Sequence, residues 1–438
     1  MISRRQALRT TLFGAGYVGL RALATGLPAA LLLDPRKALA AVPEECDATT
    51  AAKAQFIVFA TSGQGDPINA NVPGTYEDPK ISHSKDPAMA ATKLMMRGQP
   101  YTAAMPWSKL PQNVLDRAAF FHLMSNTPVH PKEPDVLKLM GTTEADEMLP
   151  SLLARQLAPC LGTIQAQPIS LGAATPSEAL SYGGRSLPQI PALALKATLA
   201  NPAGPLTNLQ PLRDRTLDQL NAIYKGSATP AQRRYIDSLV TSQAQVRNIR
   251  QDLLNQLSAI TDNSISSQIL AAVTLIQMKV TPVIAVHIPF GGDNHHDDAL
   301  ADETAQTISG VAAIGALMAQ LASAGLADQV TLMSLNVFGR TLGPGNVDGR
   351  NHNPNHQVSF AIGKAFRGGV IGGVAPVAGD YGALAIDSKT GKGTPSGDIL
   401  PANSLPSFGQ TMLASVGVAP ATIARLVNKG QVITGALV

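Results

Sequence analysis

The apolar run at residues 55–60, QFIVFA, and the turn that follows it at residues 61–67, TSGQGDP, decide the fold class. Five successive apolar residues leave no polar face, which is typical of a strand buried on both sides of a sheet. Glycine and proline then end the strand. Three further segments read as strands, at residues 118–123, 282–288 and 329–336.

Helical patterns separate these strands. A long helical stretch at about residues 206–278 has apolar side chains at three- and four-residue spacing, and another helix spans residues 302–324. Connections of this length between strands predict an α/β fold with a mostly parallel central sheet and helices on both faces. We expect a single domain at residues 41–438, with residues 206–278 as a helical insertion.

The first forty residues carry the pattern of a twin-arginine signal peptide. Arg4 and Arg5 precede an apolar run at about residues 10–33, and the small residues at 38–40, ALA, form a cleavage site. The alternative is a membrane anchor, since a bilayer needs roughly 20 apolar residues. Arg21 in the middle of the run makes a stable span costly. We therefore expect export by the Tat machinery, no stable membrane span after cleavage, and a periplasmic or secreted protein.

The net charge of +4 belongs largely to this leader. Six of the 34 basic residues but one of the 30 acidic residues lie in residues 1–40, so the remaining chain has 28 basic and 29 acidic residues. A near-neutral chain has no electrostatic footprint for nucleic acid or anionic lipid. Nucleic acid is therefore excluded as a partner.

Cys46 and Cys160 are the two cysteines of the chain. An oxidising compartment would permit them to pair, and one bridge would then tie down the start of the exported chain. Sequence gives no distance between them, so two unpaired thiols remain the alternative.

Polar side chains follow each predicted strand, where ligands of parallel sheets gather. Seven of the eight histidines lie in these strands or in the segments after them. The candidates after the four strands are Asp66; Thr127 and His130; Asp293, His295 and His296; and Arg340 and His352. The other three of the seven histidines are His122, His287 and His356, and the carboxylates of Asp297 and Asp298 follow His296.

Imidazole beside carboxylate suits zinc, manganese or iron, and glycines let the backbone turn tightly around an ion. We therefore expect the side chains that arrive from several strand ends to form a polar site that can hold a divalent metal, with calcium as a further candidate. The alternative is a solvated loop at residues 293–298 that caps the following helix through Asp297 or Asp298.

The motifs resemble a known family. They are GQGDPIN at residues 63–69, GGDNH at 291–295, FGRT at 338–341, GRNH at 349–352 and GGVIG at 368–372. Together they look like the Tat-exported proteins called domain of unknown function 1501, which are related to the alkaline phosphatase and sulfatase superfamily. The resemblance implies an alkaline-phosphatase-like fold with a metal-dependent ester-hydrolase site at the strand ends.

The resemblance also implies roles for single positions. Asp66 resembles the carboxylate after the first strand and His130 the histidine after the second. Asp293 with His295 or His296 resembles a Gly-Gly-x-Asp-x-His segment, and His352 resembles the histidine of an Asp-His pair. Three positions depart from the family pattern, because Val337, Asn351 and Val129 stand where the family usually has Glu, Asp and Ser.

Two functions follow from these matches and departures. The first is an exported metal-dependent hydrolase of a phosphate or sulfate ester. Thr127 or Ser62 would supply a hydroxyl nucleophile, and Arg340 would bind the anionic ester oxygens. A structural ion pair is the alternative role of Arg340, and a turn residue that of Thr127. The second function is a non-catalytic binding or assembly protein with a degenerate metal site, since lost carboxylates weaken cation binding.

Overall fold

The computed structural model describes residues 46–63, 65, 70–163, 165–172, 178–200, 210–230, 232–233, 236–237, 240 and 251–438. The predicted signal peptide and Asp66 lie outside the described residues.

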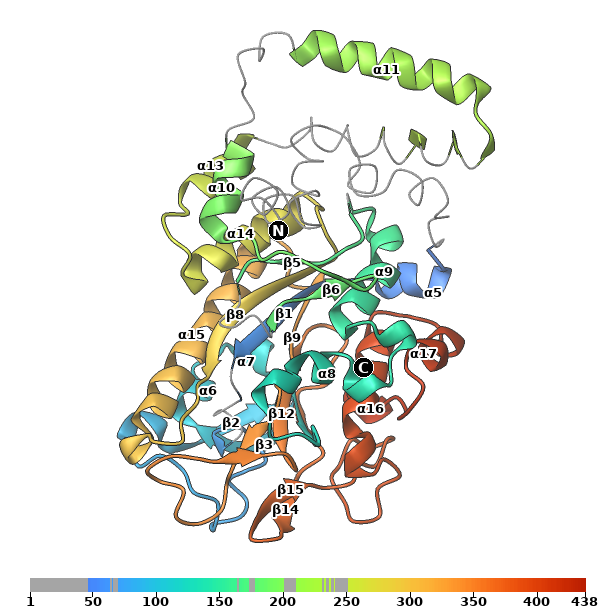
Figure 1. Ribbon diagram of the computed structural model, residues 1–438. Helices are drawn as coiled ribbons and strands as arrows, with labels where there is room; N and C mark the ends of the chain where they lie inside the picture. The colour runs from blue at the N-terminus through green and yellow to red at the C-terminus, as the bar shows by residue number, and fades with distance from the viewer. Residues whose placement is uncertain are drawn as a thin grey trace, which may run out of the picture.

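A seven-stranded sheet forms the centre of the molecule (Figure 1). The predicted strands are confirmed as β1, β4, β8 and β9, and β12 is antiparallel to its neighbours β4 and β9 while the other pairs are parallel. The carboxyl ends of the four predicted strands therefore meet at one edge. In spatial order the strands are β13 (Gly369–Ile371), β4 (Ala118–Leu123), β12 (Gln357–Ile362), β9 (Val330–Ser334), β1 (Phe56–Gly63), β8 (Val283–Gly291) and β5 (Ile169–Ser170).

Helices cover both faces of this sheet, as the sequence predicts (Figure 1). One face packs against α6 (Met105–Ser108), α7 (Gln112–Leu115), α10 (Ala192–Ala200), α13 (Gln251–Ser258), α14 (Ile265–Gln277) and α15 (Ala301–Ser323). The other face packs against α8 (Glu133–Leu137), α9 (Leu149–Leu161), α16 (Ser404–Ser415) and α17 (Pro420–Leu426). Alternate side chains of each central strand point into the apolar cores on opposite faces of the sheet. The apolar run at residues 56–60 is therefore buried throughout.

Four short hairpins lie outside the sheet. They are β2 (Ala91–Met96) with β3 (Gln99–Ala104), β6 (Ser181–Tyr182) with β7 (Arg185–Ser186), β10 (Gly339–Arg340) with β11 (His352–Asn353), and β14 (Val374–Val377) with β15 (Asp380–Ala383). Of these, the hairpin of β10 and β11 follows β9 and carries site residues.

The predicted helical stretch at residues 206–278 consists of separate helices in the described residues. Within it, α11 (Gln210–Ser227) exposes Leu220, Ile223 and Tyr224, whereas Asn221 is buried. Apolar spacing predicted a helix there correctly, but spacing alone does not say which face its neighbours cover.

Among the described residues one helix, Asp298–Ser323, is long and apolar enough to cross a membrane by length and composition. It includes α15, which lies against β8 and buries Val311, Ile314 and Leu317 in the core. The apolar side chains of this helix thus complete the core over β8.

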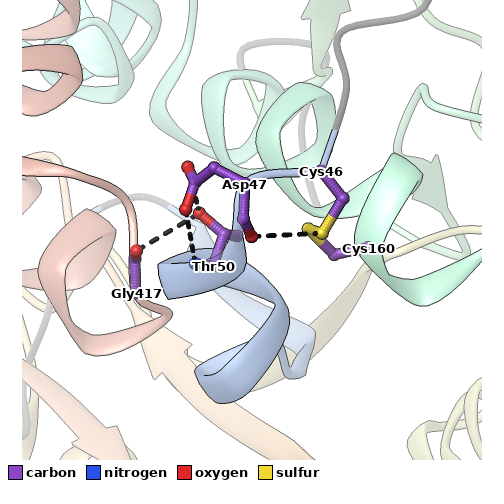
Figure 2. The surroundings of a disulfide bond; sticks show 5 residues. All are labelled: Cys46, Asp47, Thr50, Cys160 and Gly417. Carbon is purple, nitrogen blue, oxygen red and sulfur yellow. Dashed lines mark hydrogen bonds between the residues drawn. A yellow bond between two sulfur atoms is a disulfide. The ribbon is translucent and has the colours of Figure 1, made fainter.

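Cys46 and Cys160 form a disulfide that closes a loop of 114 residues (Figure 2). It joins the start of the described chain, where Asp47 caps α5 (Ala48–Lys53), to the end of α9. The hydroxyl of Thr50 donates to the carbonyl of Gly417, so the same turn also contacts the end of α16. A crosslink over a loop this long stabilises a fold by about 2–5 kcal/mol.

Candidate metal centre

Three segments that leave the carboxyl edge of the sheet build one polar cluster. His130 begins a 3-10 turn after β4, and Asp293 and His295 follow β8. After β9, the hairpin of β10 and β11 places Arg340 and His352 as cross-strand partners. Segments at residues 130, 293–295 and 340–352 are thereby brought to the same place.

The ligand atoms of His130, Asp293 and His352 lie within 4.8 Å of one another, an arrangement that can hold a metal ion. Asp293 Oδ1 is 3.8 Å from Nε2 of both His130 and His352, and 3.1 Å from Nε2 of His295. His295 is therefore a fourth candidate donor. The Asp293 side chain is 43% exposed, so the cluster is open to solvent.

The hydrogen bonds of two imidazoles direct their lone pairs into the cluster. His352 Nδ1 lies 2.6 Å from the carbonyl oxygen of Pro128, which only accepts, so Nδ1 carries the hydrogen and Nε2 the lone pair. His295 Nδ1 lies 3.1 Å from Asn351 Oδ1, and in this amide orientation its Nε2 also carries a lone pair. The two Nε2 atoms are 2.9 Å apart. Two lone pairs this close favour a cation between or beside them.

His130 is the third imidazole, and its two ring nitrogens are buried with no hydrogen-bond partner in the described structure. Such orphaned polar atoms are costly unless something satisfies them. Burial is the largest cause that lowers the pKa of His130, and repulsion from a protonated His352 and from the Arg340 guanidinium would lower it further. Burial likewise lowers the pKa of His352. Both rings are therefore neutral at pH 7, which is the form that binds a metal.

The ring of Phe338 fixes these imidazoles from one side. Its centroid lies 4.8 Å from that of His130 and 4.3 Å from that of His352, and the Arg340 guanidinium lies 5.4 Å from it. Gly65 packs against the same ring with φ of 107°, and a Cβ there would come within 2.6 Å of Phe338. The turn after β1 therefore needs glycine at this point.

Arg340 is fully buried and holds Asp293. Its Nη1 donates to Asp293 Oδ1 at 3.2 Å and its Nη2 to the carbonyl oxygen of Gly292 at 2.8 Å. Burial pushes the pKa of Asp293 upward, but the charge and hydrogen bond of Arg340, together with the neighbouring imidazoles, outweigh it, so the pKa lies below its usual value. Asp293 is thus ionised at neutral pH. These contacts match the ion-pair role expected as the alternative for Arg340.

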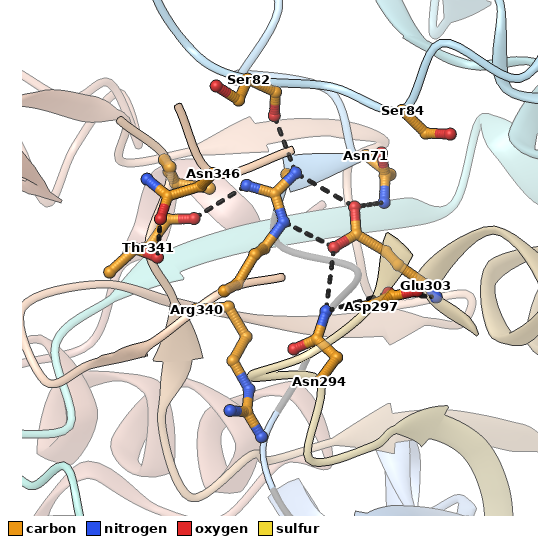
Figure 3. Close-up of polar contacts among 12 residues, drawn as sticks. Asn71, Ser82, Ser84, Asn294, Asp297, Glu303, Arg340, Thr341 and Asn346 are labelled. Atoms are coloured by element: carbon orange, nitrogen blue, oxygen red, sulfur yellow. Dashed lines mark hydrogen bonds and ion pairs between the residues drawn. The ribbon is translucent and has the colours of Figure 1, made fainter. Parts of the chain in front are cut away.

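Glu303 and Arg350 form a buried ion pair. Figure 3 shows Glu303 with Asn71 and with Asn294, the residue after Asp293. Arg350 Nε donates to Glu303 Oε2 at 2.5 Å, and Asn71 donates to Glu303 Oε1 at 2.8 Å. Asn294 donates to the same carboxylate at 3.4 Å. The pair therefore links the first turn of α15 to the two segments that carry the candidate ligands.

Backbone contacts bind the segment at residues 293–297 to that at residues 348–352. The N–H of Arg350 donates to the carbonyl oxygen of Asn294 at 2.8 Å, and Gly349 has φ of 126°. A Cβ on Gly349 would lie 2.2 Å from the carbonyl oxygen of His295, so this close approach requires glycine. The distances among the candidate ligands are thus set by the backbone.

Asp297 has the capping role that the alternative interpretation of this loop expected. Its two carboxylate oxygens accept from the N–H groups of Asp302 and Glu303, at 2.7 and 3.0 Å, in the first turn of α15. Both interpretations of residues 293–298 therefore hold in part, since Asp293 and His295 face the cluster while Asp297 caps the helix.

The remaining candidate histidines lie elsewhere. His122 and His356 are fully buried and form a pair, with His122 Nδ1 2.9 Å from His356 Nε2. His287 Nδ1 lies 3.2 Å from Glu178 Oε1. His296 is exposed and is not among the side chains gathered around Asp293 in the described part of the chain.

The structure supports no nucleophilic role for Thr127, and the side chain of Ser62 lies outside the described residues. Thr127 is buried, and its hydroxyl accepts from the N–H of Val129 at 3.3 Å, as a turn residue does. Asp66 also lies outside the described residues. Val337 is buried in the apolar core and Val129 is exposed. Neither side chain has an atom that can bind a metal.

Three positioning side chains escaped the sequence analysis, namely Phe338, Glu303 and Arg350. Phe338 stands in the quoted motif at residues 338–341, but no role was predicted for its ring. Glu303 has the pattern of an ordinary acidic residue in the first turn of a helix. Arg350 also stands in a quoted motif, but roles were predicted only for its neighbours. Long-range contacts give all three their roles, and no local spacing signals those contacts.

No curated protein matches the chain. A family model does match it over residues 207–385, which hold β8, α15, β9 and the hairpin of β10 and β11. The matched part supplies Asp293, His295, Arg340 and His352, whereas His130 lies outside it. The family is described as a protein of unknown function, DUF1501, and this match supports the resemblance that the motifs indicate.

Proposed function

We propose that this protein is an exported, metal-dependent hydrolase of an anionic ester, a phosphate or a sulfate, with an alkaline-phosphatase-like fold. The observation that carries the proposal is the convergence of three imidazoles and one carboxylate from three strand ends on one solvent-accessible point. Nitrogen-rich ligand sets of this kind suit zinc, iron or manganese better than calcium, which takes oxygen ligands.

The residues of the chain have distinct tasks in this proposal. His130, Asp293, His295 and His352 would hold the ion, which would supply a Lewis acid for the ester oxygen and for an attacking water. Arg340 keeps the Asp293 carboxylate ionised and in place. Thr127 makes the contact of a turn residue, since its hydroxyl accepts from the N–H of Val129, and we propose water as the nucleophile. The water oxygen would bond to phosphorus or sulfur while the bond from that atom to the ester oxygen breaks. One proton of the water would pass to the departing oxygen, which leaves as an alcohol.

The proposed place of action is outside the cytoplasm, in the periplasm or in the medium. The twin arginines, apolar run and cleavage site of residues 1–40 support export through the Tat machinery. The disulfide between Cys46 and Cys160 supports an oxidising compartment.

A non-catalytic binding protein is the second candidate, and one feature favours it. Arg340, the nearest guanidinium to Asp293, is fully buried and donates to Asp293 and Gly292 rather than facing solvent. A substrate anion would therefore rely on the ion itself. A protein that retained only the binding step would need no further cation.

Replacing Asp293 by asparagine or His352 by alanine should lower kcat/KM by at least ~100-fold, because each change removes a ligand that the ion needs. The measurement is hydrolysis of aryl phosphate mono- and diesters and aryl sulfates by the exported chain supplied with zinc or manganese. His296→Ala should stay within about threefold of the unchanged protein, because that side chain is exposed. Metal-loaded protein that hydrolyses none of these esters would favour the binding-protein alternative.

A further inference from the structure

We propose that Asn351 is a positioning residue that makes His295, and not the adjacent His296, the fourth ligand of the metal site. The inference rests on the proposed function, because it concerns the same site. It follows from the contact between Asn351 Oδ1 and His295 Nδ1, which are 3.1 Å apart.

The backbone of Asn351 is held on both sides. Its N–H donates to the hydroxyl of Thr341 at 3.0 Å, and its carbonyl oxygen accepts from the N–H of Thr341 at 2.9 Å. The Thr341 hydroxyl is itself in contact with Asn346 Oδ1 at 2.9 Å (Figure 3). The Asn351 side chain therefore starts from a fixed point.

The backbone of His295 is fixed against the same segment. Arg350, the residue before Asn351, donates its N–H to the carbonyl oxygen of Asn294, and the Cα of Gly349 lies close to the carbonyl oxygen of His295. The two segments thus lie side by side, with the amide oxygen opposite the imidazole.

The amide oxygen then selects the tautomer of the ring. When Asn351 Oδ1 accepts from Nδ1–H, the lone pair of neutral His295 lies on Nε2. That atom faces the cluster, 3.1 Å from Asp293 Oδ1 and 2.9 Å from His352 Nε2. The Pro128 carbonyl orients His352 in the same way. Each of the two imidazoles thus has an oxygen behind it, as metal-binding histidines do.

The test is a zinc titration of the metal-free exported chain by calorimetry. Asn351→Leu keeps the size of the side chain but loses the acceptor, and should weaken zinc binding by about 10–100-fold. Asn351→Asp restores an acceptor and should bind zinc at least as tightly as the unchanged protein. Asn428→Leu, an exposed asparagine after α17, serves as the matched control and should bind normally.

A cycle with His295→Ala separates positioning from a general structural role. In that background Asn351→Leu should have no further effect on zinc affinity, since the ring it orients is gone. The melting temperature of the metal-free Asn351→Leu protein should equal that of the unchanged protein. Nitrogen NMR of the metal-free protein should show His295 with its hydrogen on Nδ1, and a shift toward the other tautomer in Asn351→Leu.

The outcomes distinguish this inference from the proposed function. Zinc binding that is unchanged in Asn351→Leu overturns the inference and leaves the hydrolase proposal standing. Weaker binding in Asn351→Leu, in a protein that hydrolyses no ester, supports the inference and overturns the hydrolase. An unchanged protein that binds neither zinc nor manganese overturns both.

Discussion

Replacing Glu303 by leucine should lower the free energy of unfolding by about 3–5 kcal/mol, because it leaves the Arg350 guanidinium buried without its counter-charge. Both side chains are fully buried, and the carboxylate also accepts from Asn71 and Asn294. Urea unfolding of the metal-free protein measures the change.

The matched control is the double variant Glu303→Leu with Arg350→Met. With both charges gone, the loss should be smaller than in the single variant, since no uncompensated charge stays buried. Arg350 also donates to the carbonyl oxygens of Ser82 and Thr341, so a remaining loss of about 1–2 kcal/mol is expected. A single variant that costs less than about 1 kcal/mol would contradict the role of this pair in holding the site together.

As the pH falls, the protein should begin to lose stability at pH values well above those at which carboxylates titrate. The cause is the buried pair of His122 and His356. Burial lowers the pKa of His122 to about 4, and burial and His122 together lower the pKa of His356 well below its ordinary value. In the unfolded chain both titrate near 6.5. Their stabilising contribution is therefore fully present above pH 6.5 and is lost as the pH falls toward 4, because the unfolded state then binds protons that the folded state does not.

Two such histidines should cost roughly 2–3 kcal/mol of stability per pH unit in this window. The measurement is the free energy of unfolding by urea at pH 7, 6 and 5. His356→Gln can still donate to His122 but no longer titrates, so its slope should be smaller than that of the unchanged protein by about 1.4 kcal/mol per pH unit. An equal slope in both proteins would show that other groups cause the acid response.

The sheet could be predicted from sequence because its central strands are buried on both faces. Residues 56–60 and 283–286 are continuous apolar runs, and such runs have few other ways to be buried. The edge strands β5 and β13 have two and three residues, too few to show a pattern. The exposure of α11 could not be predicted either, because Leu220, Ile223 and Tyr224 have the spacing of a buried apolar face and are nevertheless exposed.

The candidate site was predictable to the level of segments, and less so to the level of side chains. His130, Asp293 and His352 follow strand ends, and parallel topology brings strand ends together. His122 and His356 were counted with them, but these side chains point into the core and pair with each other. The choice between His295 and His296 needed the backbone of the loop, because neighbouring residues in a turn point in directions that sequence does not specify.

Elemental analysis of the protein, purified without chelator, tests the central claim most directly. The proposed site predicts about one equivalent of zinc, iron or manganese per chain, and its loss in the Asp293→Asn and His352→Ala proteins. A well-folded protein that carries no metal, and that takes up none when zinc or manganese is added, would contradict the metal site and with it the proposed hydrolase.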